Sequence, residues 1–329
     1  MARKITVIGG AGFVGTNLCK KLAYNQQDFE IIDLKMSNQF PDKTKIADVR
    51  DINSLRETVS GDVVINLAAI HSDDIRDSKE YQRTNVDGSE NIARVCTEKG
   101  ISKIIFTSTV AVYGFAPPNT DETGSINPFN EYGRTKFQAE EKLRLWRESG
   151  DNSLIIVRPT VIFGEHNRGN VYNLLKQVAA RKFIMIGQGQ NKKSMAYIDN
   201  VAAFLDACIK TDRSYGLFNY TDTPDLKMNE LVLFARNKLH NKKNLGFILP
   251  EWLGLVLGNM ADFAAFMFRK NFPVSLIRVK KFTSETSFAS SKEDLDDFVA
   301  PIPLLCGLER TLQSEFISPD QNAEIFITE

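Results

Sequence analysis

Tyr132 and Lys136 are the two residues whose types and spacing most directly indicate chemistry. They lie four positions apart in a helical pattern, so their side chains would share one face of the helix. A phenol, with a reference pKa of about 10, is a weak base at neutral pH, but a nearby ammonium group favours its phenolate. The pair is therefore a candidate centre for proton transfer. An ordinary solvated helix face has the same spacing, so the hypothesis needs support from other residues.

Thr109 supplies a second hydroxyl group near the end of a predicted strand. The segment 106–114 begins as a strand and carries hydroxyl groups where the strand ends. Open α/β sheets bind ligands at the carboxyl ends of their strands, so Thr109 would hydrogen-bond the reacting oxygen of a substrate. The alternative is an ordinary backbone contact at a strand end.

A glycine-rich turn indicates a dinucleotide site. Gly9, Gly12 and Gly15 directly follow the strand Ile5–Ile8, where glycine lets the backbone approach a pyrophosphate at a helix N-terminus. Asp33 ends the next strand, where its carboxylate would bind the ribose hydroxyls of NAD and repel the 2′-phosphate of NADP. The sequence thus favours NAD over NADP. A tight turn beside an exposed aspartate is the alternative.

These residues must be positioned by alternating strands and helices. Short β-rich runs alternate with helical patterns, which indicates a parallel sheet with helices on both faces. The expected fold is an α/β, Rossmann-type, doubly wound parallel sheet with a smaller, mainly C-terminal substrate-binding lobe. The predicted strands are 5–8, 30–33, 63–66, 103–108 and 154–158, and the predicted helices are 13–24, 52–59, 78–99, 130–147, 171–180 and 201–209.

The regular alternation of predicted strands and helices ends after Arg158-Pro159, which indicates two units that are interleaved in sequence. Residues 1–165 plus about 197–222 are predicted to form the NAD-binding domain. Residues 166–196 plus 223–329 are predicted to form the substrate-binding lobe. The apolar stretch 245–268 is interrupted by polar residues and by Pro250, which favours a buried or lid helix over stable membrane insertion.

Composition excludes several other classes of protein. Lys+Arg and Asp+Glu are both 41, so no charge excess indicates a nucleic-acid partner. The four cysteines are far apart, which indicates neither a zinc site nor a disulfide framework, and no other metal site is expected. The N-terminal apolar run is too short for a signal peptide, so a cytoplasmic location is expected.

Taken together, the motifs resemble those of an extended short-chain dehydrogenase/reductase of the NAD-dependent epimerase/dehydratase family. Nearly the whole chain takes part in the resemblance, although each motif alone is weak. The matching segments are 9–15, Asp33, Asp48-Val49, Asn66-Leu-Ala-Ala69, Asn85-Val-Asp-Gly88, the Thr109 strand, Tyr132 with Lys136, and Arg158-Pro-Thr-Val-Ile-Phe-Gly164.

The resemblance implies a role for each matching residue. Tyr132 would be the catalytic acid and base, Lys136 would bind the nicotinamide ribose, and Thr109 would complete the catalytic set. Lys193 stands where the family usually has arginine, and Arg278 is a weaker match to a phosphate-binding arginine. A homodimer through helices near 79–99 and 131–147 is a further expectation. The implied cofactor-binding residues are Gly9, Gly12, Phe13, Val14, Gly15, Asp33, Asp48, Val49, Ala68, Ala69, Asn85, Tyr132, Lys136 and Pro159, and the implied substrate-binding residues are Thr109, Tyr132, Asn170, Lys193 and Arg278.

The reaction itself is less constrained. Dehydratases of the family place Asp-Glu directly after the catalytic threonine, whereas Val110-Ala111 follows here and disfavours dehydration. A 4-epimerase of a UDP-sugar, serving surface-polysaccharide synthesis, ranks first. A 4-ketoreductase of a 4-keto-6-deoxy nucleotide sugar is nearly level with it. A non-catalytic NAD-binding protein is a remaining alternative, because fold alone does not fix chemistry.

Other charged residues are weaker candidates for the substrate. Arg168 and Arg181 could bind a pyrophosphate, but solvated surface roles are favoured for both. His71 and His166 follow motif strands and could contact the sugar, with structural roles given at least equal weight.

Overall fold

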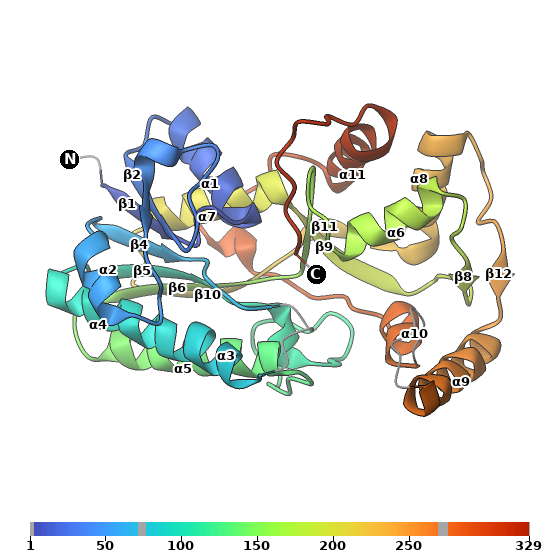
Figure 1. Cartoon of the computed structure of the whole chain (residues 1–329), viewed down its shortest axis with the longest axis horizontal. Helices are drawn as coiled ribbons and strands as arrows, with labels where there is room; N and C mark the ends of the chain where they lie inside the picture. The colour runs from blue at the N-terminus through green and yellow to red at the C-terminus, as the bar shows by residue number, and fades with distance from the viewer. Residues whose placement is uncertain (1–2, 72–76, 269–275, 329) are drawn as a thin grey trace.

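A parallel sheet of seven strands forms the centre of the computed structural model, which describes residues 3–71, 77–268 and 276–328 (Figure 1). The strand order is β10-β6-β5-β4-β1-β2-β3, so the chain winds outward in both directions from β1 and β4. The predicted doubly wound α/β fold is confirmed. The strands are β1 (Ile5–Ile8), β2 (Phe29–Asp33), β3 (Thr44–Ile46), β4 (Val63–Asn66), β5 (Lys103–Thr107), β6 (Ser153–Pro159) and β10 (Tyr215–Tyr220).

The central strands form where the sequence has runs of aliphatic and β-branched residues, because a sheet covered on both faces buries every side chain. All residues of β1 and β4 are buried. The five predicted strands are confirmed to within one residue at each end. β3 and β10 were not predicted. β3 has only three residues at a sheet edge, and β10 is interrupted by Gly216 and the polar Asn219.

Helices cover the sheet in two layers. α1 (Phe13–Tyr24) and α7 (Ile198–Lys210) pack on one face, whereas α2 (Ile52–Thr58), α4 (Gly88–Lys99) and α5 (Glu131–Glu148) pack on the other. Because side chains alternate along a strand, Val7 belongs to the first core and Ile8 to the second. Because the strands are parallel, their carboxyl ends lie together at one edge of the sheet, which is where ligands bind in folds of this kind.

The predicted helix 78–99 differs from the structure in its middle. The helical run begins with α3 (Lys79–Tyr81), continues as a π-helical segment (Gln82–Asp87) and ends as α4. Pattern analysis could not detect this change, because both helix types keep apolar residues on one side. Such π-helical insertions occur frequently at functional sites, and this one contains Asn85.

The remaining elements form the smaller lobe. A three-stranded sheet has the order β11-β9-β7, and β8 pairs in parallel with β12. A third apolar core in this lobe includes Phe163, Leu175, Tyr197 and Leu308, and it also contacts Phe13 of α1. The elements are β7 (Val161–Phe163), α6 (Asn170–Ala179), β8 (Met185–Ile186), β9 (Lys192–Tyr197), β11 (Asp222–Lys227), α8 (Met228–His240), β12 (Ile248–Leu249), α9 (Glu251–Phe268), α10 (Leu276–Thr283) and α11 (Leu304–Leu312).

The apolar stretch 245–268 forms β12 and α9 at one end of the molecule (Figure 1). The sequence favoured a buried or lid helix here, but the structure leaves Trp252 and Met260 of α9 largely exposed. Within the ranges that the structure describes, no helix is long and apolar enough to cross a membrane.

Candidate active site

Tyr132 and Thr109 come together because the first turn of α5 packs on the short 3-10 helix Val110–Tyr113 that follows Thr109. Asn130 caps α5 by accepting a hydrogen bond from the Gly133 amide at 2.9 Å. Gly133 is needed at the contact, since a Cβ there would lie 2.5 Å from the carbonyl oxygen of Ala111. The Thr109 hydroxyl is hydrogen-bonded to the Tyr132 phenol.

The electrostatics of the pair are dominated by burial. Burial raises the pKa of Tyr132 to about 12, and the hydrogen bond with Thr109 opposes this shift. Burial also lowers the pKa of Lys136 to about 7, while the negative charge of Glu140 opposes that shift. Lys136 Nζ lies 4.1 Å from the centroid of the Phe106 ring, close enough for a cation–π contact. Lys136 is thus fully buried and Tyr132 half-buried, within one small cluster.

Glu140 lies one turn beyond Lys136 on α5 and centres a buried polar network. Its carboxylate accepts from Ser108 Oγ at 2.6 Å and from two nitrogens of Arg158 at 2.8 and 2.5 Å. Arg158 also donates to the Tyr113 hydroxyl at 2.6 Å. The network ties α5 to the ends of β5 and β6, directly behind Thr109. Sequence reasoning missed Glu140, although its spacing from Tyr132 and Lys136 places it on the same helix face.

The glycine turn makes contacts so close that side chains would be excluded. Gly9 has a φ of +80°, and a Cβ there would lie 2.8 Å from the amide nitrogen of Ala68. A Cβ on Gly15 would lie 2.4 Å from the carbonyl oxygen of Gly9. Asp33 holds the turn by accepting a hydrogen bond from the Ala11 amide at 2.9 Å. A backbone turn of this kind at the start of α1, beside a carboxylate, fits the pyrophosphate and ribose of NAD.

Asp48 and Val49 follow β3 at the same rim of the sheet. The Asp48 carboxylate pairs with Arg50, which lowers the pKa of Asp48, and the Val49 side chain packs against Gly88. Pro159 ends β6 and is buried.

Asn85 connects the loop after β4 to α5. Its side-chain oxygen accepts from the Ile70 amide at 2.8 Å, and its amide group donates to the Ile70 carbonyl and the Thr135 hydroxyl, both at 3.0 Å. Ala68, in the same loop, donates its amide to the Asn66 side chain at 3.1 Å, and Ala69 follows it. Asn85 thus positions the loop with its side chain.

Apart from Thr109 and Tyr132, the predicted substrate residues are spread over the smaller lobe. Asn170 is exposed at the first turn of α6. Lys193 lies on β9 and donates to the Ser284 carbonyl at 2.6 Å, and burial lowers its pKa to about 8. Arg278 belongs to α10, but its side chain lies outside the described part of the structure. The structure therefore does not bring these three residues into one described cluster.

The weaker candidates occupy distinct positions. Arg168 forms an ion pair with the buried side chain of Glu315 and its guanidinium lies 4.1 Å from the centroid of the Tyr172 ring, so it is a paired, half-buried cation and not the solvated surface charge that the sequence favoured. The His71 ring lies 6.3 Å from the Tyr132 ring, centroid to centroid, and the residue is exposed. His71 is therefore next to the catalytic candidate, whereas the backbone of His166 binds Glu315.

The C-terminal tail was not predicted to take part, yet it reaches the glycine turn. Phe326 packs on Phe13, the first residue of α1, with ring centroids 5.7 Å apart. Thr328 donates its hydroxyl to Asn167 at 2.6 Å. In Figure 1 this tail runs from α11 to the middle of the molecule, between the sheet and the smaller lobe. The short apolar run Ile325-Phe326-Ile327 gave no signal specific enough to detect this role.

Comparison with known proteins decides the family. The model of the NAD dependent epimerase/dehydratase family matches residues 5–219. The chain belongs to this family. Members are NAD-dependent enzymes, so the predictions of an enzyme and of NAD as its cofactor are confirmed, as is the resemblance seen in the motifs.

Relatives within the epimerase/dehydratase family cover the chain from end to end. It is 44% identical over 335 residues, which span 100% of both chains, to an Escherichia coli O157:H7 protein named N-acetyl-alpha-D-glucosaminyl-diphospho-ditrans,octacis-undecaprenol 4-epimerase. A UDP-N-acetylglucosamine 4-epimerase structure from Methanobrevibacter ruminantium is 20% identical with a TM-score of 0.75, covering 94% of this chain and 97% of that chain. The Thermus thermophilus UDP-glucose 4-epimerase with NAD is 18% identical with a TM-score of 0.73, covering 96% and 100%. The two structures show the same fold.

Proposed function

We propose that the protein is a 4-epimerase of an N-acetylhexosamine that is joined through a diphosphate to a polyprenol. One observation carries the proposal, namely the 44% identity with the Escherichia coli undecaprenol-linked 4-epimerase over the full length of both chains. Identity at this level spans the smaller lobe as well as the sheet. The Tyr132, Thr109 and Lys136 cluster supplies the groups that such a reaction needs.

In the proposed reaction, Tyr132 takes the proton of the sugar 4-hydroxyl and later returns it. NAD, held by the Gly9–Gly15 turn and Asp33, would supply the acceptor for the C4 hydride and the donor that returns it to the opposite face of the 4-keto sugar. Thr109 hydrogen-bonds the same oxygen and stabilises the charge that develops on it. Because one proton and one hydride leave and both return, the reaction has no net oxidation.

Lys136 and Glu140 set the proton affinity of Tyr132 in this proposal. Burial keeps the Tyr132 phenol protonated in the free protein, since it raises the pKa of that group to about 12. A protonated Lys136 one turn away stabilises the phenolate, and the charge of Glu140 helps Lys136 to keep its proton. The positive charge of the oxidised cofactor acts in the same direction.

We propose that the two units of the chain bind different ligands. Residues 1–165 plus about 197–222 hold NAD, and residues 166–196 plus 223–329 hold the sugar diphosphate. The Gly9–Gly15 turn binds the cofactor pyrophosphate and Asp33 binds its adenosine ribose. Asp48, Val49, Ala68, Ala69 and Pro159 line the cofactor cleft with Phe13 and Val14, Asn85 supports it, and Asn170, Lys193 and Arg278 contact the substrate.

Two further proposals concern the state of the protein in the cell. A cytoplasmic location is supported by the cysteines, because Cys19, Cys96, Cys208 and Cys306 are free thiols. A homodimer through α4 and α5 is supported by the packing of these two helices side by side on one face of the sheet.

A UDP-linked sugar is the second candidate substrate. It is favoured by the fold shared with UDP-sugar 4-epimerases and by a Vibrio cholerae UDP-glucose 4-epimerase that is 27% identical over 79% of this chain. Both candidates share the sugar diphosphate and differ only in what lies beyond it.

The test offers both substrates to the purified protein with NAD. N-acetylglucosaminyl-diphospho-polyprenol in detergent and UDP-N-acetylglucosamine are incubated separately, and the released sugars are separated by chromatography. We expect interconversion of the gluco and galacto forms on the polyprenol carrier, without accumulation of NADH. Turnover of the UDP-sugar alone would favour the second candidate substrate. In a separate incubation with NADH and a 4-keto-6-deoxy nucleotide sugar, consumption of NADH would favour a reductase.

A further inference from the structure

Over residues 251–260, the outer side of α9 exposes large apolar side chains, with Asn259 among them, where a surface helix normally carries mainly polar residues. Trp252, Val256 and Met260 are spaced by four residues and form one stripe, with 65%, 46% and 62% of each residue exposed. Leu257, beside this stripe, is also exposed, and Phe247 and Ile248 extend the apolar surface just before the helix. Exposed apolar patches of this kind mark interaction surfaces.

The inner side of α9 fixes the direction in which the stripe faces. Gly254 packs so closely on β8 that a Cβ there would lie 2.7 Å from Cγ2 of Ile186, and Val279 of α10 lies on the same side. α10 packs along α9, as Figure 1 shows. The stripe residues cannot turn inward while this packing holds, so their exposure is a property of the folded lobe.

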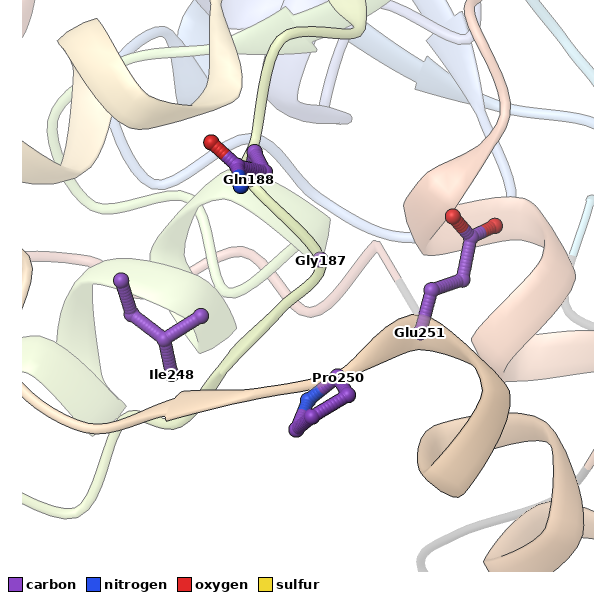
Figure 2. A pocket seen from close by; sticks show the side chains of 5 residues that line it. All are labelled: Gly187, Gln188, Ile248, Pro250 and Glu251. Atoms are coloured by element: carbon purple, nitrogen blue, oxygen red, sulfur yellow. The ribbon is translucent and has the colours of Figure 1, made fainter.

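The start of α9 also borders a hollow in the smaller lobe. This open hollow has a volume of about 320 Å³. Figure 2 shows the residues that line it, which are Gly187 and Gln188 after β8, Ile248 of β12, Pro250, and Glu251 at the start of α9. The same chain segment, 187–193, leads from the hollow to Lys193, a proposed substrate residue. The apolar stripe thus begins beside the part of the lobe proposed to hold the sugar diphosphate.

Positive charge accompanies the apolar stripe. α10, which packs on α9, contains Arg278, Lys280 and Lys281 and no acidic residue, and the side chain of Lys280 is exposed. The sequence has no Asp or Glu between Asp262 and Glu285. Apolar residues next to cations are the pattern of helices that lie in the interface of an anionic membrane.

We propose that α9 docks on the surface of an anionic lipid bilayer, with Trp252, Val256 and Met260 inserted at the boundary between head groups and acyl chains. The helix lies on the bilayer, and α10 places the exposed Lys280 against the acidic lipids. This proposal rests on the proposed function for its purpose, because a polyprenol-linked substrate is held in a membrane. A second copy of the chain fits less well, since a symmetric contact through this face would bring the two basic α10 helices together.

Vesicle binding tests the docking without any substrate. The intact protein is sedimented with phosphatidylcholine vesicles that either contain or lack phosphatidylglycerol. We expect binding that requires the anionic lipid and weakens at high salt. The double variant Trp252→Ser/Met260→Ser should bind roughly tenfold or more weakly, because it removes two inserted apolar side chains. The control Tyr24→Ser, at an aromatic residue that is 84% exposed on α1, should bind as the unchanged protein does.

A second measurement reports directly on Trp252. The chain has two tryptophans, and Trp146 is buried, so the variant Trp146→Phe leaves Trp252 as the single emitter. We expect its fluorescence to shift to shorter wavelength on anionic vesicles and to be quenched by brominated acyl chains. An unchanged spectrum, or equal vesicle binding by the double variant, would overturn the docking proposal. Conversion of a dimer to a monomer by Trp252→Ser/Met260→Ser, with vesicle binding intact, would assign the stripe to a second copy instead.

The outcomes also separate docking from the proposed function. With docking and the function both correct, the double variant loses activity on polyprenol-linked sugar in vesicles but keeps it on the same substrate dissolved in detergent. Vesicle binding without any epimerisation would leave the docking supported and reject the proposed function. Epimerisation in vesicles that does not depend on α9 would support the function and reject the docking.

Discussion

The carboxylate of Glu140 accepts two hydrogen bonds from the guanidinium of Arg158, at 2.8 and 2.5 Å, and both side chains are fully buried. Glu140 lies on α5 and Arg158 on β6, so the pair fixes the helix that carries Tyr132 and Lys136 against the sheet. A buried pair of this kind is far costlier to break than to keep, because either partner alone is left charged and unpaired.

Glu140→Gln should therefore destabilise the protein by about 3 to 5 kcal/mol, as measured by denaturant unfolding. Arg144→Ala is the matched control, since Arg144 pairs with the same carboxylate from the more exposed side. Its effect on the free energy of unfolding should stay within about 1 kcal/mol. Equal effects of the two substitutions would show that the buried pair with Arg158 does not fix α5.

Tyr132→Phe should lower turnover by about 100-fold or more while NAD binding persists, because the ring stays and the transferable proton is lost. Turnover is measured on the sugar diphosphate that the protein converts, and NAD binding by calorimetry. Tyr215→Phe, at the more exposed end of β10, serves as the control and should leave both quantities unchanged. A fully active Tyr132→Phe protein would exclude Tyr132 as the acid and base.

Asp33→Ala should weaken NAD binding by about tenfold or more, because it removes a carboxylate that holds the Ala11 amide and is placed for the ribose. Asp33→Asn separates the two roles. Its amide oxygen can still accept from Ala11, but the negative charge that opposes the 2′-phosphate of NADP is gone. We expect the Asp33→Asn protein to bind NAD more tightly than the Asp33→Ala protein does. Its preference for NAD over NADP should be smaller than that of the unchanged protein. An unchanged ratio of NAD to NADP affinity would remove the discriminating role from Asp33.

The buried Lys136 should make the stability of the NAD-free protein depend on pH. Burial lowers its pKa from 10.5 to about 7, so between these values the unfolded chain binds a proton that the folded chain lacks. The free energy of unfolding contributed by this group then rises as pH increases through that window. Lys136→Met should therefore show a smaller gain in stability between pH 7 and about 10. Lys20→Met, at an exposed position on α1, should keep the slope of the unchanged protein.

Phe326→Ala should speed the release of NAD, because the Phe326 ring packs on Phe13 directly after the glycine turn. Ile327→Ala is the matched control, as the neighbouring Ile327 is 76% exposed. The rate of NAD release is followed after rapid dilution of the loaded protein. Identical rates for the two variants would separate the C-terminal tail from cofactor retention.

Local patterns in the sequence determined the central fold and the core of the candidate site. The strands 5–8 and 63–66 are fully buried apolar runs, and the glycines after β1 permit a turn that few other residues adopt. Tyr132 and Lys136 share a helix face through their spacing alone. Each of these signals needs only neighbouring residues, which is why one sequence suffices to detect it.

Tertiary structure alone decided the contacts between distant segments. Glu140 pairs with Arg158 only because α5 packs on β6. Asn85 hydrogen-bonds Ile70 from a π-helical segment that the apolar pattern of the sequence does not indicate. The tail places Phe326 on Phe13 across nearly the whole chain. The apolar pattern of α9 is visible in the sequence, but which face is exposed depends on the packing of Gly254 against Ile186. Which side chains are buried or paired depends on the segments that the fold brings next to them. The spacing of residues within one segment does not contain that information.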